Sequence, residues 1–138
     1  MPEVKIPPHN EEAETSILGA ILIDKDAVVA VAEFLRPEHF YNPNHSSIYE
    51  VLLELYEERQ PIDIITLKEK LKSKKLLAKV GGVGYLTELV NAVPTSAHVE
   101  QYAKIVKDNY TKRELISSAT KIAEEAFGEE EQLSLIHI

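Results

Sequence analysis

The sequence predicts an all-α fold: a small multi-helix bundle followed by one long protruding helix that starts a truncated helical hairpin. Apolar residues recur every three or four positions along most of the 138 residues, which is the period of a helix with one buried face. Asn, Asp, Pro and Gly residues stand where such helices would begin and end. The β-branched run at 62–66 has no obvious partner strand and is therefore expected to be an extended connector.

The first two helices are expected between two proline positions. Pro7-Pro8 predicts an extended lead-in, since proline cannot occupy a helix interior. Asn10 is the expected N-cap of the first helix, and the apolar face that follows consists of Ala13, Ile17, Leu18, Ile21 and Leu22. The segment Asp24-Lys25-Asp26 interrupts this pattern and offers a cap for a second helix, which Pro37 is expected to end.

Three further helices complete the predicted bundle. Asn42 followed by Pro43 is a strong start signal for the third, which Pro61 is expected to end. Asp63 or Thr66 should cap the fourth helix. The segment Gly81-Gly82-Val83-Gly84 predicts a turn into a fifth helix, and the buried positions of these three helices are Ile48, Val51, Leu52, Leu55, Tyr56, Leu67, Leu71, Tyr85, Leu86, Leu89 and Val90.

The longest predicted helix covers 97–128, begins after a cap at Thr95 or Ser96, and contains neither Gly nor Pro before Gly128. A helix of this length measures about 45 Å, more than a bundle of this size needs, so its far end should protrude. Its apolar side chains there need a partner to cover them. The predicted organisation is a lead-in at 1–9, a bundle at 10–96, the long helix at 97–128, and a tail at 129–138 that is either a truncated hairpin or a cloning remnant.

Composition excludes several classes of function. The net charge of −8 disfavours direct binding of nucleic acid, because that affinity comes mainly from Lys and Arg. The chain has no Cys, which excludes disulfides and thiolate metal sites. No apolar run has the length of a signal peptide or a membrane span, so we expect a cytoplasmic protein that does not bind membranes.

No motif in the chain predicts a catalytic residue, a cofactor or a metal. Tyr85 and Leu86 stand where a phosphate loop after Gly81-Gly82 would need Lys and Ser or Thr. The five histidines lack metal-ligand spacing and no carboxylate is placed consistently around them, so His45 is expected to be packed or hydrogen-bonded. A basic patch is expected to be a solvated helix face rather than a docking site for an acidic partner or nucleic acid, and it comprises Lys68, Lys70, Lys72, Lys74, Lys75 and Lys79.

Taken in order, a series of segments between residues 7 and 127 resembles the N-terminal domain of bacterial replicative DNA helicases, the DnaB family. The resemblance is carried by their order and spacing rather than by any one of them. The segments are Pro7-Pro8, Glu12-Ala13-Glu14, Leu18-Gly19-Ala20-Ile21-Leu22-Ile23-Asp24, Phe40-Tyr41 with His45 and Ile48-Tyr49, Pro61-Ile62-Asp63-Ile64-Ile65-Thr66-Leu67, Gly81-Gly82-Val83-Gly84-Tyr85-Leu86, Val93-Pro94-Thr95-Ser96-Ala97, and Tyr102-Ala103-Lys104-Ile105-Val106-Lys107 with Arg113.

This resemblance implies a non-catalytic domain that forms dimers through a helical hairpin and assembles them into a collar on a hexameric ring. It further implies that the collar recruits primase through the C-terminal region of primase and, in some members, contacts a helicase loader. The RecA-like motor of the family has no counterpart in these 138 residues, so no ATP hydrolysis is expected from them.

The resemblance assigns the primase-facing surface to Tyr85, Ile116 and Ile122. Leu115 joins them on physical grounds, because it lies on the same protruding part of the long helix, where anchors for a partner would sit. An equally weighted interpretation is that these side chains pack against the second helix of the hairpin or a sister subunit. The apolar residues 133–138 do not continue the acidic, Leu/Ile-spaced pattern of that second helix.

Two alternative functions remain open from the sequence. The first is the helicase-binding C-terminal domain of a bacterial primase, which has a similar helical fold and would act from the other side of the same contact. The second is a stand-alone enzyme with an unrecognised site, for which ATP turnover and metal content are the direct checks.

Overall fold

The computed structural model describes residues 6–93 and 95–137, and side chains as far as Gly128. These residues form six α-helices and one short 3₁₀ helix and contain no strand, so the all-α prediction is confirmed. The elements are α1 (Glu11–Ile23), α2 (Asp26–Val31), η1 (Pro37–His39), α3 (Pro43–Glu57), α4 (Ile64–Ser73), α5 (Gly82–Ala92) and α6 (Val99–His137). Residues 1–5 of the expected lead-in, Pro94 and residue 138 lie outside the described residues.

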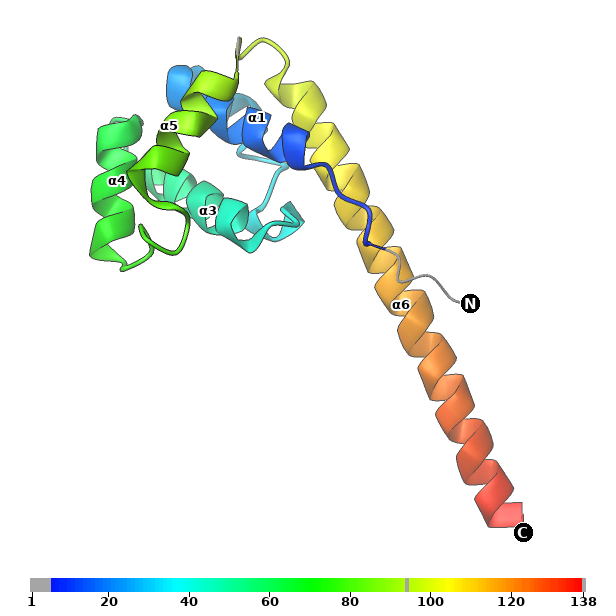
Figure 1. The fold of residues 1–138 in the computed structure, drawn as a ribbon. Helices are drawn as coiled ribbons and strands as arrows, with labels where there is room; N and C mark the ends of the chain where they lie inside the picture. The colour runs from blue at the N-terminus through cyan, green and yellow to red at the C-terminus, as the bar shows by residue number, and fades with distance from the viewer. Residues whose placement is uncertain (1–5, 94, 138) are drawn as a thin grey trace.

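Helix α1 lies at the centre of the bundle and contacts α2, α3, α5 and α6 (Figure 1). Nearly all of its apolar residues are buried because it has neighbours on several sides. Gly19 allows α5 to approach closely, since a Cβ atom there would overlap the Leu89 carbonyl oxygen and the Val93 side chain. From this bundle α6 extends outward for more than half of its length (Figure 1).

The structure confirms three predicted N-caps. Asn10 Oδ1 accepts a 2.9 Å hydrogen bond from the Ala13 amide, and Asn42 Oδ1 accepts one of 2.9 Å from Asn44. Of the two candidates for α4, Asp63 is the cap: its carboxylate accepts from the Thr66 amide at 2.8 Å. The Thr66 hydroxyl accepts in return from the Asp63 amide at 3.0 Å, which completes a capping box.

Helix α2 is shorter than predicted. It ends at Val31, six positions before Pro37, rather than continuing to that proline. Pro37 forces Arg36 into an extended conformation (φ −112°, ψ 156°), and the chain turns before reaching it. Leu35, beyond the end of α2, nevertheless stays fully buried.

Helices α3 and α4 end in the same way, with a positively charged residue in the left-handed region. Arg59 has φ 57° and Lys75 has φ 61°. After α3 the Gln60 amide donates to the Leu55 carbonyl at 2.9 Å, and after α4 the Leu76 amide donates to the Leu71 carbonyl at 2.8 Å. These are Schellman caps, and α3 therefore ends at Glu57 instead of running on to Pro61.

The bounds of α6 differ from the predicted range 97–128 at both ends. The Thr95 hydroxyl accepts from the Ala97 amide at 3.2 Å, and the Ser96 hydroxyl donates to Asp24 at 2.9 Å, so neither caps the helix that begins at Val99. At the other end the helix runs through Gly128 to His137, because one Gly in a helix costs only about 1 kcal/mol. The predicted tail at 129–138 is thus helical as far as the structure describes it.

None of the helices in the described residues combines the length and the apolar character that crossing a membrane requires.

Candidate functional site

The N-terminal part of α6, residues 99–113, is fixed to the bundle. Val99, Ala103 and Val106 are buried against α1 and α2. Arg113 marks the end of this contact: its Nη1 donates to the Pro8 carbonyl at 2.9 Å and its Nη2 donates to the His39 carbonyl at 2.8 Å. One guanidinium group therefore ties α6 to both the lead-in and η1.

Beyond Arg113 every residue at 114–127 is exposed. Leu115, Ile116 and Ile122 are 65%, 54% and 66% exposed, as the sequence predicted for a protruding helix. Phe127, at 69%, belongs to the same surface but was not predicted as a site residue. Its spacing from Ile116 and Ala123 could have revealed it, because residues three, four, seven and eleven apart share a helix face. We call these four side chains, Leu115, Ile116, Ile122 and Phe127, the α6 stripe.

A groove adjoins the α6 stripe where α6 meets the lead-in. It has a volume of about 590 Å³ and is lined by Ile6, Pro7, Pro8, Arg113, Ile116 and Ser117. Ile116 therefore belongs both to this groove and to the exposed stripe. An apolar surface that continues from a groove onto a bare helix has the shape of a site for another helix.

Tyr85, the fourth predicted site residue, does not join the stripe. It is half-buried on α5, and its ring lies parallel to the His45 imidazole with 5.9 Å between centroids. Its hydroxyl forms a hydrogen bond with His45 Nε2, so its described contacts of this kind are with α3 rather than α6. Burial raises the pKa of Tyr85, and the nearby carboxylates of Glu11, Glu88 and Glu14 raise it further.

His45 lies within a carboxylate cluster, so the expectation that no carboxylate is placed consistently around the histidines does not hold for His45. The expectation that His45 is packed or hydrogen-bonded is confirmed. Glu14 is 1% exposed, and its Oε1 accepts a 2.9 Å hydrogen bond from His45 Nδ1. The same carboxylate accepts from the amides of Tyr41 at 2.7 Å and Asn42 at 3.2 Å. A signal was present: Glu14 stands three and four positions before Ile17 and Leu18, on the buried face of α1.

This cluster acts as a structural clamp. Donor atoms of Glu11, Glu14 and His45 lie within 4.8 Å of one another, a spacing that a metal ion can bridge. The Glu14 carboxylate is already used by three donors, however, and both ring nitrogens of His45 are hydrogen-bonded. Asn42 Nδ2 donates to Glu11 at 2.9 Å. These bonds join α1, α3 and α5, and they account for the burial of two polar side chains.

The predicted basic patch is partly neutralised by α3. Lys70 pairs with Glu58 and lies 3.6 Å from Glu54, and Lys74 lies 2.8 Å from Glu54. The hydrogen bond to Glu58 raises the pKa of Lys70. These pairs join α3 to α4 at the surface, in agreement with the interpretation of the patch as a solvated helix face.

Comparison with known proteins finds one family. The profile of the DnaB-like helicase N terminal domain matches residues 6–108. The replicative DNA helicase DnaB of Geobacillus stearothermophilus is 39% identical over 132 residues, which cover 96% of this chain and 29% of that protein. The chain thus spans less than a third of the length of this relative.

The solved structures that resemble the chain include two that match most of its length. The N-terminal domain of DnaB helicase from Mycobacterium tuberculosis matches with a TM-score of 0.88 at 37% identity, over 91% of this chain and 90% of that one. A DnaB-like replicative helicase, described together with its interactions with primase, matches with a TM-score of 0.74 at 34% identity. That match covers 84% of this chain and 27% of the helicase chain.

Proposed function

The chain belongs to the family of DnaB-like helicase N-terminal domains, and from this premise we propose that it is the non-catalytic collar domain of a replicative DNA helicase. In this role it supports assembly of the helicase ring and recruits primase in the cytoplasm. The domain does not include the ATPase motor that such helicases carry, so the work of unwinding belongs to another part of the protein. A helicase loader is a further proposed partner of the same domain.

The observation that carries this proposal is the α6 stripe. Four large apolar side chains, each more than half exposed, project from the part of α6 beyond Arg113, where every residue at 114–127 is exposed. Exposed apolar surface of this kind is characteristic of a protein interface, since water contact with it is unfavourable. Assembly of the domain would cover it.

We propose that the α6 stripe binds two partners. One is the α6 region of a second copy, which would form the dimer unit of the collar. The other is the C-terminal domain of primase, for which Ile116 and Ile122 are the proposed anchors, joined by Leu115. Tyr85 remains a proposed second contact on α5, although its hydroxyl is already engaged by His45.

Light scattering of the chain over a range of concentrations, with and without the primase C-terminal domain of the same organism, tests both self-assembly and primase binding. Ile116→Glu and Ile122→Glu place a charge in the stripe and should lower the mass of the assembly and weaken primase binding. Lys121→Glu, which is equally exposed on the opposite side of α6, is the matched control. Unchanged assembly and unchanged primase binding in both isoleucine variants would contradict the proposal.

The alternative of a primase C-terminal domain is not favoured, because the matching profile and the three similar proteins are all helicases.

A further inference from the structure

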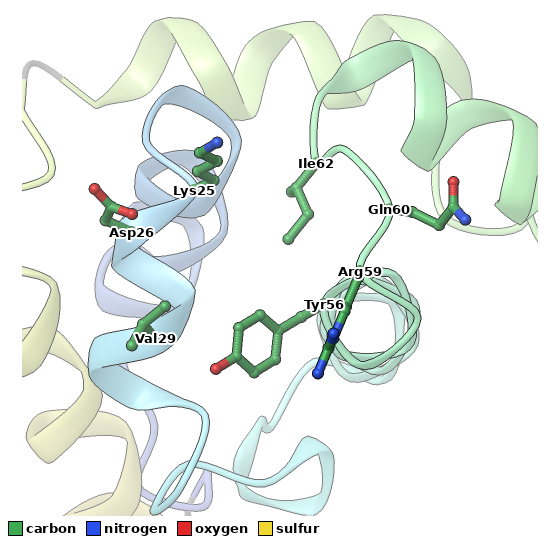
Figure 2. Close-up of a pocket in the computed structure, with 7 residues that line it drawn as sticks. All are labelled: Lys25, Asp26, Val29, Tyr56, Arg59, Gln60 and Ile62. Atoms are coloured by element: carbon green, nitrogen blue, oxygen red, sulfur yellow. The ribbon is translucent and has the colours of Figure 1, made fainter.

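A second hollow lies between α2 and the connection from α3 to α4 (Figure 2). It is lined by Lys25, Asp26, Val29, Tyr56, Arg59, Gln60 and Ile62. None of these residues belongs to α6, so this surface is separate from the α6 stripe. We call it the α2 hollow.

Three of the seven residues that line the α2 hollow, Val29, Tyr56 and Ile62, supply its apolar surface. Figure 2 shows Val29, Tyr56 and Ile62 arranged around the same space, with Val29 on α2 and the other two across from it. Val29 is 56% exposed, so its side chain is accessible to a partner. The hollow measures about 230 Å³. Small-molecule sites usually measure roughly 300–1,000 Å³, so the α2 hollow suits one side chain of a peptide better than a cofactor.

Two cationic side chains stand at the rim of the α2 hollow. Among the described residues, neither Lys25 nor Arg59 has a carboxylate oxygen within 4.0 Å, unlike Lys70 and Lys74 nearby. The lining also contains one carboxylate, that of Asp26 on α2 (Figure 2). Two cations against one carboxylate leave the lining with a net charge of +1, in a chain whose net charge is −8.

The backbone of Arg59 adds a further observation. Arg59 occupies the C′ position of a Schellman cap at φ 57°, where Gly is the favoured residue and a side chain costs about 1 kcal/mol or more. A cation near the end of a helix interacts well with the helix dipole, which accounts equally for Lys75 after α4. Arg59 lines the α2 hollow, and Lys75 does not.

We propose that the α2 hollow is a docking site for an acidic peptide segment of a partner protein. One apolar side chain of the segment enters between Val29, Tyr56 and Ile62, and its flanking carboxylates pair with Lys25 and Arg59. The apolar insertion supplies affinity, and the charge pairs fix the position of the peptide and its electrostatic preference. This site goes beyond the proposed collar function, and it does not depend on the α6 stripe.

Binding of a fluorescent peptide of aspartates with one central leucine tests the proposal by anisotropy, with the full chain as the receptor. Arg59→Gly removes the cation and also the strain of a side chain in the left-handed region, so the variant should fold normally. Its affinity for the peptide should be about tenfold lower than that of the wild type. Lys75→Gly makes the same change at the equivalent cap outside the hollow and should bind like the wild type. Val29→Glu, which places a carboxylate in the hollow, should also weaken binding.

Two further peptides separate the contribution of the apolar side chain from that of the carboxylates. Replacing the leucine by serine, or the aspartates by asparagines, should each reduce binding, and added salt should weaken the aspartate peptide in particular. Equal losses in Arg59→Gly and Lys75→Gly would overturn the proposal, since they would indicate general attraction to positive charge. Binding unaffected by the loss of leucine would overturn it as well. A rise in mass of the free chain that Val29→Glu abolishes would assign the hollow to a second copy instead.

Discussion

Glu14 and His45 form a fully buried pair in which the carboxylate accepts a 2.9 Å hydrogen bond from the imidazole Nδ1. The two residues are 31 positions apart, on α1 and in the first turn of α3. The same carboxylate binds the amides of Tyr41 and Asn42 just before α3 begins. One side chain of α1 thereby holds the start of α3 in place.

Loss of this carboxylate should destabilise the fold strongly. Glu14→Ala leaves the Tyr41 and Asn42 amides and the His45 ring without their acceptor, so we expect the free energy of unfolding to fall by about 3 kcal/mol. Urea denaturation measures this change. Glu12→Ala alters an exposed carboxylate of the same helix turn and should cost less than about 1 kcal/mol. Comparable losses in the two variants would refute the clamp.

Two glycines should respond oppositely to alanine. Gly19→Ala forces a methyl group against Leu89 and Val93 and should lower the free energy of unfolding by about 1–3 kcal/mol. Gly128→Ala adds a methyl group in open space within α6 and should increase helix content, with a gain of up to about 1 kcal/mol. Urea denaturation and circular dichroism together check both, and a stabilised Gly19→Ala variant would contradict the close contact of α1 with α5.

Stability should fall as the solution becomes acidic, partly through His39. Burial lowers the pKa of His39 below its ordinary 6.5, and Lys107, Arg36 and Arg113 add to this against the opposing effect of Glu38. The unfolded chain then binds the proton more readily than the folded one. The free energy of unfolding should therefore decline as the pH falls below about 6.5.

Urea titrations on both sides of that pH, for the wild type and His39→Gln, isolate this contribution. Glutamine retains an acceptor for the Arg36 amide, which now donates to His39 Nδ1 at 2.9 Å, but it does not titrate. The variant should lose part of the acid-dependent decline. An identical pH dependence in both proteins would count against a lowered pKa of His39.

The α6 stripe should matter little for folding of the single chain. Ile122 is 66% exposed, so Ile122→Glu should change the unfolding free energy of the monomer by no more than about 0.5 kcal/mol. Ile17→Ala, at a fully buried position of α1, should cost about 2–5 kcal/mol. Urea denaturation at a concentration where the chain is monomeric measures the unfolding free energies of the two variants. A large loss for Ile122→Glu would mean that the stripe packs against this same chain.

Features set by neighbours in the sequence could be predicted, and features set by distant contacts could not. The caps at Asn10, Asn42 and Asp63 depend on residues three positions away or fewer, and each was found in its predicted form or as one of two candidates. The pairing of Glu14 with His45 depends on how α1 packs against α3, and no local pattern encodes that geometry.

The long helix illustrates both sides of this limit. Its length and periodicity are enough to predict that Leu115, Ile116 and Ile122 are exposed apolar residues. The predicted end at Gly128 is wrong, because the small penalty of one glycine does not stop a helix whose flanking residues favour it. Tyr85 lies apart from these residues, on α5 beside His45, and its role as a partner contact stays a prediction.

Because Arg113 holds α6 to the bundle, any change in the tilt of this helix moves its far end more than its anchored part. The 24 residues from 114 to 137 extend roughly 36 Å past Arg113 at 1.5 Å per residue. A tilt of about 10° at Arg113 would swing the far end through roughly 6 Å, the width of a side chain. A rotation of the bundle would therefore displace the tip of α6 much further than the part of the helix that Arg113 holds.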